Sequence, residues 1–146
     1  MHQLFMGEKI SLQRAIEQKK MLRCFIEVSE EVGGELLIAG SVSLTWDPKE
    51  NECYIGVLWI EPEFRGNGLA TYILSEITNF ADELGIVLTL LVIPFISPEI
   101  KPTTEDILEL KEFYQQFGFN DNSETKERGI CCSMERLPDT RSINKI

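Results

Sequence analysis

The chain has 146 residues, a formal net charge of −10, and 43% hydrophobic and 26% charged residues. These totals predict a single soluble domain with a substantial hydrophobic core. They argue against nucleic-acid binding, because the sequence has no basic cluster to displace counterions from a phosphate backbone. The acidic surface favours a cationic substrate or partner, although solubility alone would account for it.

No segment has the pattern of a targeting or membrane element. Residues 1–9 lack the basic region and long apolar stretch of a secretory signal. The longest apolar run, residues 86–96, is interrupted by Thr89 and Pro94 and is too short to span a bilayer. We therefore expect a cytoplasmic protein with no membrane partner.

The first part of the chain is expected to hold one helix and three strands. Residues 10–20 predict a short helix of poor periodicity, and residues 22–28 alternate as a strand does. After a glycine-containing turn, residues 36–46 are expected to form a second strand, and residues 53–60 a third.

A strand–helix–strand unit follows. Residues 66–84 place apolar side chains at helical spacing, and Gly85 provides the C-cap. Residues 86–93 are apolar on both faces, as in a central strand. Strands joined by such a crossover run parallel, so residues 53–60 and 86–93 are expected to pair in parallel.

The last part of the chain predicts one helix and a hairpin. Prolines keep residues 94–103 out of regular structure, and Thr104 is the expected N-cap of a helix over residues 105–116. A final strand, residues 130–137, is expected to form a hairpin with residues 119–123.

These elements predict an α/β fold with a mixed, mostly antiparallel sheet flanked by helices. No repeat or linker divides the chain, so we expect one domain over residues 1–137 and a frayed tail over residues 138–146. The sequence leaves the oligomeric state open and is compatible with a homodimer.

The cysteines predict no metal site. Cys24, Cys53, Cys131 and Cys132 lack metal-ligand spacing, and the single histidine is His2. All four cysteines fall in predicted strands, where a free cysteine behaves as a small core residue. A redox role for the adjacent pair is the less favoured alternative.

The most informative segment joins the third strand to the long helix and reads Arg65-Gly-Asn-Gly-Leu-Ala70. Its glycines let the backbone approach a ligand, and the first amides of a helix are unpaired donors at the positive end of its dipole. The turn is therefore predicted to hold a phosphate. A dinucleotide-binding turn would need glycine in place of Thr71, and a P-loop would need Gly-Lys-Ser/Thr, so neither pattern fits.

Arg65, Gly68 and Ala70 match the pattern Arg-x-x-Gly-x-Gly/Ala, and here the chain resembles the GCN5-related N-acetyltransferase (GNAT) superfamily. Other segments are similar to that family in the same order. They are the fourth strand and its bend (58–64), the Phe-Tyr-x-x-x-Gly-Phe segment (113–119) and the closing strand (132–137). The resemblance covers about residues 23–137 and implies the GNAT fold.

The resemblance implies acetyl-CoA as cosubstrate and no metal. It implies that the central parallel strands splay apart to admit CoA, so that backbone groups of Leu58, Trp59 and Ile60 pair with the pantetheine arm. The diphosphate would then meet the side chain of Arg65 and the backbone amides of Gly66, Asn67, Gly68, Leu69 and Ala70.

Tyr114 is the candidate general acid, because the tyrosine of this segment lies beside the CoA sulfur in related enzymes. A phenol with the ordinary pKa of ~10 suits proton donation to a thiolate leaving group. The alternative is that Tyr114 is a core residue on the apolar stripe of its helix.

Glu52 is the candidate general base, since some histone-acetylating relatives carry a glutamate on the matching strand. The alternative is a solvated turn residue, and Glu27 and Glu61 are weaker substitutes for the base. Trp46 and Trp59 would either line an acceptor pocket or pack in the core.

Two departures from the family pattern affect the expected contacts. Ile107, beside Asp106, stands where relatives commonly have an asparagine that contacts pantetheine. The segment before Tyr114 is about ten residues longer than usual, which predicts a lid or substrate loop near residues 94–103.

Together these features predict an acetyl-CoA-dependent N-acetyltransferase. It would move the acetyl group to a primary amine of a small molecule or protein by direct attack in a ternary complex. The alternative is a non-catalytic acyl-CoA-binding sensor or interaction module with the same fold.

Overall fold

The computed structural model describes residues 6–92, 101, 103–121 and 133–139. Most of the expected irregular segment 94–103 and most of the predicted tail 138–146 lie outside these ranges. The Cys131–Cys132 pair also lies outside them. The elements, in chain order, are α1 (Met6–Gln18), β1 (Leu22–Val32), β2 (Glu35–Asp47), β3 (Glu52–Ile60), a 3₁₀ turn (Pro62–Phe64), α2 (Leu69–Leu84), β4 (Val87–Leu91), α3 (Thr104–Gln115), β5 (Asn120–Asp121) and β6 (Ser133–Arg136).

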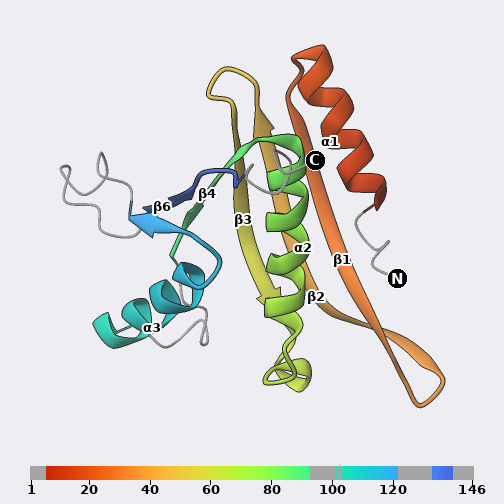
Figure 1. Ribbon diagram of the computed structural model, residues 1–146. Coiled ribbons are helices and arrows are strands. Elements are labelled where there is room, and N and C mark those ends of the chain that lie inside the picture. The colour runs from red at the N-terminus through yellow and green to blue at the C-terminus, as the bar shows by residue number, and fades with distance from the viewer. Residues whose placement is uncertain (1–5, 93–100, 102, 122–132, 140–146) are drawn as a thin grey trace.

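The six described strands form one sheet in the order β1-β2-β3-β4-β6-β5 (Figure 1). Only the β3–β4 pair is parallel, and the other four pairs are antiparallel. The predicted mixed, mostly antiparallel α/β fold is therefore confirmed, as is the parallel crossover through α2. No helix among the described residues is long and apolar enough to cross a membrane.

Several boundaries differ from the sequence-based expectation. Helix α1 begins at Met6, and α2 begins at Leu69 because Gly66 and Gly68 have φ of +81° and +79°, outside the helical region. Strands β1 and β2 extend to a tight turn at Gly33–Gly34, so the hairpin is longer than expected. The N-cap of α3 is Thr103 rather than Thr104, because Thr103 and Asp106 form a reciprocal capping box.

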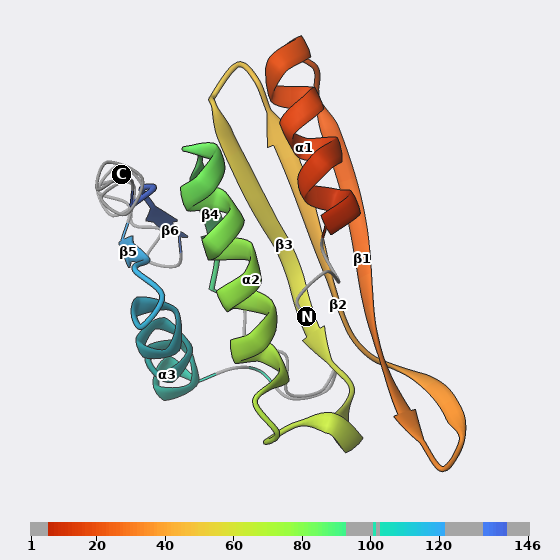
Figure 2. The ribbon, with the colours of Figure 1, turned by 45° about the vertical axis from the view of Figure 1, so that its right-hand side comes forward.

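Helices α1 and α2 cover the same face of the sheet, which we call the inner face (Figure 2). Apolar side chains alternate onto this face, for example Ile26 and Val28 of β1, which are 5% and 3% exposed. Helix α2 contributes Ile73 and Ile77, both fully buried, which explains the predicted apolar stripe. The core fixes the position of α2, and hence of its N-terminus, against β3.

Strands β3 and β4 separate beyond the middle of β3. Their parallel register covers only Glu52–Ile55 and Val87–Leu90, while β3 continues to Ile60 along β2. On the β2 side, Gly56 and Val57 together oppose Ser43, which is a β-bulge. A Cβ atom on Gly56 would collide with the Ser43 hydroxyl in its present position, so a larger residue there would force the Ser43 side chain to move.

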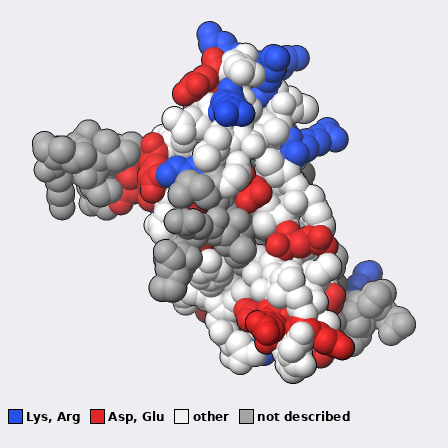
Figure 3. All heavy atoms as spheres, turned by 90° about the vertical axis from the view of Figure 1, so that its right-hand side faces the viewer, with Lys and Arg blue, Asp and Glu red and all other residues white. Residues whose placement is uncertain are grey.

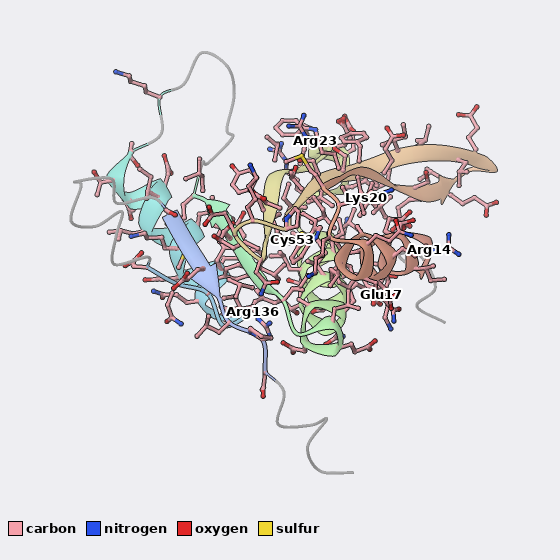
Figure 4. The ribbon with its side chains drawn as sticks, turned by 90° about the horizontal axis from the view of Figure 1, so that it is seen from above. Arg14, Glu17, Lys20, Arg23, Cys53 and Arg136 are labelled. Carbon is pink, nitrogen blue, oxygen red and sulfur yellow. The ribbon has the colours of Figure 1, made fainter. Side chains whose placement is uncertain are left out.

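Arg136 of β6 connects three elements on the inner side (Figure 4). Its Nη1 and Nη2 donate to the two carboxylate oxygens of Asp82 on α2, at 2.7 and 3.1 Å. Its Nε donates to the carbonyl oxygen of Phe117, just after α3, at 2.6 Å. One guanidinium therefore fixes the C-terminal ends of α2 and α3 relative to each other.

Candidate active site

A pocket of about 560 Å³ lies between the end of β3, the start of α2 and helix α3. It forms where β3 and β4 have separated, so its floor is the end of β3 that lies beyond the register with β4. Its lining residues come from all three elements: Leu58, Trp59, Ile60, Phe64, Arg65, Gly66, Gly68, Leu69, Ala70, Thr71, Asp106, Glu109, Leu110, Phe113 and Tyr114.

The turn before α2 presents backbone donors to this pocket. The first hydrogen bond of the helix runs from the Tyr72 amide to the Gly68 carbonyl at 3.0 Å, so the amides just before Tyr72 precede the helical ladder. Gly66 and Gly68 have open space where a Cβ would lie. The turn can therefore accept an anionic group close to its backbone, at the positive end of the α2 dipole.

The end of β3 offers a second set of backbone groups. Residues Leu58, Trp59 and Ile60 pair on one side with Val42, Ser41 and Gly40 of β2. On the other side, no described strand continues the ladder beyond Ile55. This edge can bind an extended amide-containing chain in the way that an added strand would bind.

Arg65 is held at the mouth of the pocket by contacts to β3. Its Nε donates to the Ile60 carbonyl at 2.8 Å, and its guanidinium carbon lies 4.8 Å from the centre of the Trp59 ring. The indole Nε1 of Trp59 in turn donates to Glu61 at 3.3 Å. Arg65 is the only basic residue of the described pocket lining, so it dominates the attraction for anions there.

Tyr114 lines the pocket from α3 and is 8% exposed. Its ring packs against Phe113 and Phe119, with centroids 5.7 and 5.9 Å away. Burial raises the pKa of Tyr114 to about 12. The phenol is therefore protonated throughout the neutral and moderately alkaline range, and it can serve as a hydrogen-bond donor to a ligand in the pocket.

Two carboxylates of α3 also face the pocket, Asp106 and Glu109. Asp106 accepts a hydrogen bond from the Thr103 amide at 2.8 Å as part of the capping box, while Glu109 is exposed. Their charges oppose that of Arg65. The α3 wall consequently disfavours an anion, whereas the turn before α2 attracts one.

The structure brings most of the predicted site residues together. Tyr114 and all of the predicted cofactor-binding residues except Asn67 line the pocket, and Asn67 is exposed in the same turn. Glu52 lies at the opposite end of β3, paired with Asp47 and Val87, and does not line the pocket.

Two further expectations met different outcomes. Trp46 is 2% exposed and packs in the core, which is one of the two predicted alternatives, whereas Trp59 lines the pocket. Ile107 packs against the core, and its neighbour Asp106 faces the pocket instead. Among the described residues there is no group of three or more His, Cys, Asp or Glu side chains that could hold a metal ion.

Sequence reasoning missed six lining residues: Phe64, Thr71, Asp106, Glu109, Leu110 and Phe113. Four of them lie on α3 at helical spacing from one another, so they share one face of this helix. Phe64 and Thr71 flank the glycine turn and carry no comparable signal.

Comparison with known proteins identifies the family. Residues 3–119, well over half of the chain, match the model of the acetyltransferase (GNAT) family. The chain belongs to this family. Membership implies acyl-CoA-dependent acetyl transfer to an acceptor. A comparison with curated protein sequences finds no match for this GNAT domain.

Solved structures with a similar fold include an acetyltransferase from Bacillus cereus, 22% identical with a TM-score of 0.53 over 90% of each chain. Tetrahymena GCN5 is 10% identical, with a TM-score of 0.53 over 96% of this chain and 91% of that one. The PaiA N-acetyltransferase of Thermoplasma acidophilum, solved in complex with coenzyme A, is 16% identical, with a TM-score of 0.50 over 89% of this chain and 70% of that one. These similarities show that the GNAT domain has the fold of those enzymes.

Proposed function

We propose that the chain is an acetyl-CoA-dependent N-acetyltransferase that acetylates a primary amine by direct attack in a ternary complex. One observation carries this proposal. A single pocket contains a helix-start anion cradle, the end of β3 beyond its register with β4, and a buried phenol whose pKa is raised. A diphosphate, a pantetheine arm and a thioester sulfur follow one another along acetyl-CoA. The anion cradle, the strand edge and the phenol can bind these three groups, respectively.

The residues present fit acetyl-CoA. The open space at Gly66 and Gly68 leaves room for a diphosphate against the backbone, and Arg65 supplies a fixed positive charge. The free edge of β3 supplies amides and carbonyls for the two amides of the pantetheine arm. The coenzyme A complex of the similarly folded PaiA enzyme supports this assignment.

In the proposed reaction, a neutral amine attacks the thioester carbonyl and the carbon–sulfur bond breaks. Backbone amides at the end of β3 polarise the carbonyl oxygen. Tyr114 donates a hydrogen bond, and then its proton, to the departing sulfur. The proton lost by the amine nitrogen returns through water to the Tyr114 oxygen. The products are an amide and the free thiol of coenzyme A, and the phenol is restored.

The proposal assigns no dedicated general base. Glu52 lies at the far end of β3 and does not line the pocket, so its role as a general base stays a prediction. Amines that are partly neutral at the working pH need no such group. We infer that the acceptor is drawn as a cation by the acidic surface and reacts after losing its proton to water.

The test compares wild-type protein with Tyr114→Phe, by release of the coenzyme A thiol with a panel of amines. We expect a loss of turnover of about 10²-fold or more, with little change in acetyl-CoA affinity by calorimetry. Tyr54→Phe is the matched control, because Tyr54 is exposed on β3 and does not line the pocket. Equal turnover of Tyr114→Phe and wild type would remove Tyr114 from the mechanism. Acetyl-CoA binding without thiol release for any amine would instead favour the non-catalytic module.

A further inference from the structure

Strand β1 forms one edge of the sheet, and among the described residues its only strand neighbour is β2. It is eleven residues long, which is unusual for an edge strand, because a long row of unpaired backbone groups favours association with other chains. The first half of β1 also carries Phe25, which is 68% exposed on the outer face of the sheet. Both features indicate a surface that pairs with another strand.

The charges along β1 are segregated by sign. Lys19 and Lys20 lie just before β1 and Arg23 lies at its start, whereas Glu27 lies at its middle and Glu30 and Glu31 lie near its end, all of them exposed. Figure 3 views this side of the molecule and shows basic side chains at its upper end and acidic side chains below. Figure 4 places Lys20 and Arg23 close together at that upper end.

An antiparallel pairing of β1 with a second copy of itself brings these opposite charges together. When Phe25 faces Phe25 of the second copy, Arg23 faces Glu27, and the lysines that precede β1 lie toward the acidic end of the partner strand. Directly opposed residues in such a pair lie on the same face, so Arg23, Phe25 and Glu27 all remain on the outer face. The inner face then pairs Cys24 with Ile26, which keeps apolar side chains beneath α1.

The neighbouring registers lack this complementarity. A register centred on Ile26 places Phe25 opposite Glu27 and leaves Arg23 opposite Ser29. A register centred on Cys24 places Arg23 opposite Phe25. A shift that centres Glu27 sets two like charges against each other. A register centred between two residues would place inner-face residues of one copy opposite outer-face residues of the other. One register alone satisfies charge and face together.

We propose that two copies of the chain associate through antiparallel β1–β1 pairing centred on Phe25, which joins the two sheets into one continuous sheet. Charged residues on an edge strand protect it from non-specific pairing. On β1 the charges are arranged so that they favour pairing with a second copy in a single register. The pocket is lined by β3, α2 and α3 and contains no residue of β1, so each copy keeps its own site.

The test uses reciprocal charge reversals and reads molecular mass. Wild-type protein at about 100 μM, where interfaces of micromolar affinity are occupied, is expected to show twice the chain mass of 16.7 kDa by light scattering after gel filtration. Arg23→Glu and Glu27→Arg each set two symmetry-related pairs of like charges against each other. Each variant alone should dimerise about tenfold more weakly or not at all.

Mixing the two variants provides the decisive measurement. Arg23→Glu paired with Glu27→Arg restores opposite charges at both contacts, so the equimolar mixture is expected to recover the dimer mass. Glu50→Arg, a charge reversal in the exposed turn after β2, is the control and should dimerise as wild type does. Phe25→Asp, which places two carboxylates at the centre of the interface, gives a second route to the monomer.

Three results would overturn the inference: a monomeric wild type, dimers that survive all of these substitutions, or a mixture that does not reassociate. Circular dichroism of each variant checks that it is folded, and Phe25→Asp replaces any variant that is not. Because the readout is mass rather than turnover, failure here leaves the proposed acetyl transfer untouched.

Discussion

The guanidinium carbon of Arg65 lies 4.8 Å from the centre of the Trp59 ring, while its Nε donates to the Ile60 carbonyl at 2.8 Å. Trp59 is itself tied to Glu61 through its indole nitrogen. The end of β3 therefore orients the arginine through the protein's own contacts. A charge that is already oriented loses less conformational entropy when an anion binds.

Removal of the Trp59 ring should weaken acetyl-CoA binding while Arg65 is still present. We expect Trp59→Leu to raise the dissociation constant by about 3- to 30-fold, the range of a cation–π contact of about 0.5–2 kcal/mol. Trp59→Phe is the control, because it retains an aromatic face but not the indole donor. Titration calorimetry measures both variants, and equal affinities for Trp59→Leu and wild type would show that the stacking does not position Arg65.

Gly68→Val should abolish acetyl-CoA binding, because the added side chain occupies the open space next to the first amides of α2. Part of any effect will be backbone strain, since Gly68 has φ of +79°. Gly34→Val is the matched control, with φ of +84° in the β1–β2 turn, far from the pocket. Both variants should lose similar stability in thermal melts, and only Gly68→Val should lose binding. Retention of full affinity would mean that the turn does not hold the diphosphate.

Neutralising the acidic wall of the pocket should strengthen binding. Glu109 lines the pocket and is exposed, so Glu109→Gln is expected to lower the acetyl-CoA dissociation constant by about 2- to 5-fold at low salt, with the gain fading at high salt. Glu112→Gln, exposed on the same helix and outside the pocket lining, should have no such effect. If the two variants behave alike, Glu109 has no specific influence on the ligand.

The buried phenol of Tyr114 predicts a loss of stability at alkaline pH. Its folded-state pKa of about 12 lies above the ordinary value of 10, so the unfolded chain releases this proton first as pH rises. The phenol's contribution is therefore intact below pH ~10 and is lost between pH ~10 and ~12, by up to about 2–3 kcal/mol. Tyr114→Phe should remove this component of the pH dependence of the unfolding free energy.

Cys53 contributes to the same pH range, because burial raises the pKa of its thiol to about 12. The comparison of Tyr114→Phe with wild type isolates the phenol, since Cys53 is present in both. Identical alkaline unfolding curves for the two proteins would contradict the raised pKa of Tyr114.

The elements set by local sequence signals were predictable. Gly85 ends α2 with φ of +69°, as its position after an apolar stripe indicated, and the crossover required β3 and β4 to be parallel. Features that depend on distant partners were not. The bulge at Gly56–Val57 depends on Ser43 of another strand, and nothing near Gly56 in sequence encodes that contact.

The same limit applies to the site. The glycine turn and Tyr114 carry local motifs, and both line the pocket. Trp46 of β2 and Trp59 of β3 have similar sequence surroundings, yet the first is buried in the core and the second lines the pocket. The bulge in β3 shifts the alternation of faces, so that Trp59 faces away from Cys53, which pairs with Trp46. The strand that begins at Glu52 was predicted correctly. Which end of this strand faces α3 could not be predicted, because that depends on where β4 stops pairing with β3.

The Arg136 contacts lie at the C-terminal ends of α2 and α3, whereas the pocket is lined by the first turn of α2 and by the whole length of α3. Arg136 therefore ties the end of α3 that carries Tyr114 to the helix whose first turn supplies the backbone donors of the pocket. A change in the Arg136 contacts would move the phenol relative to those donors.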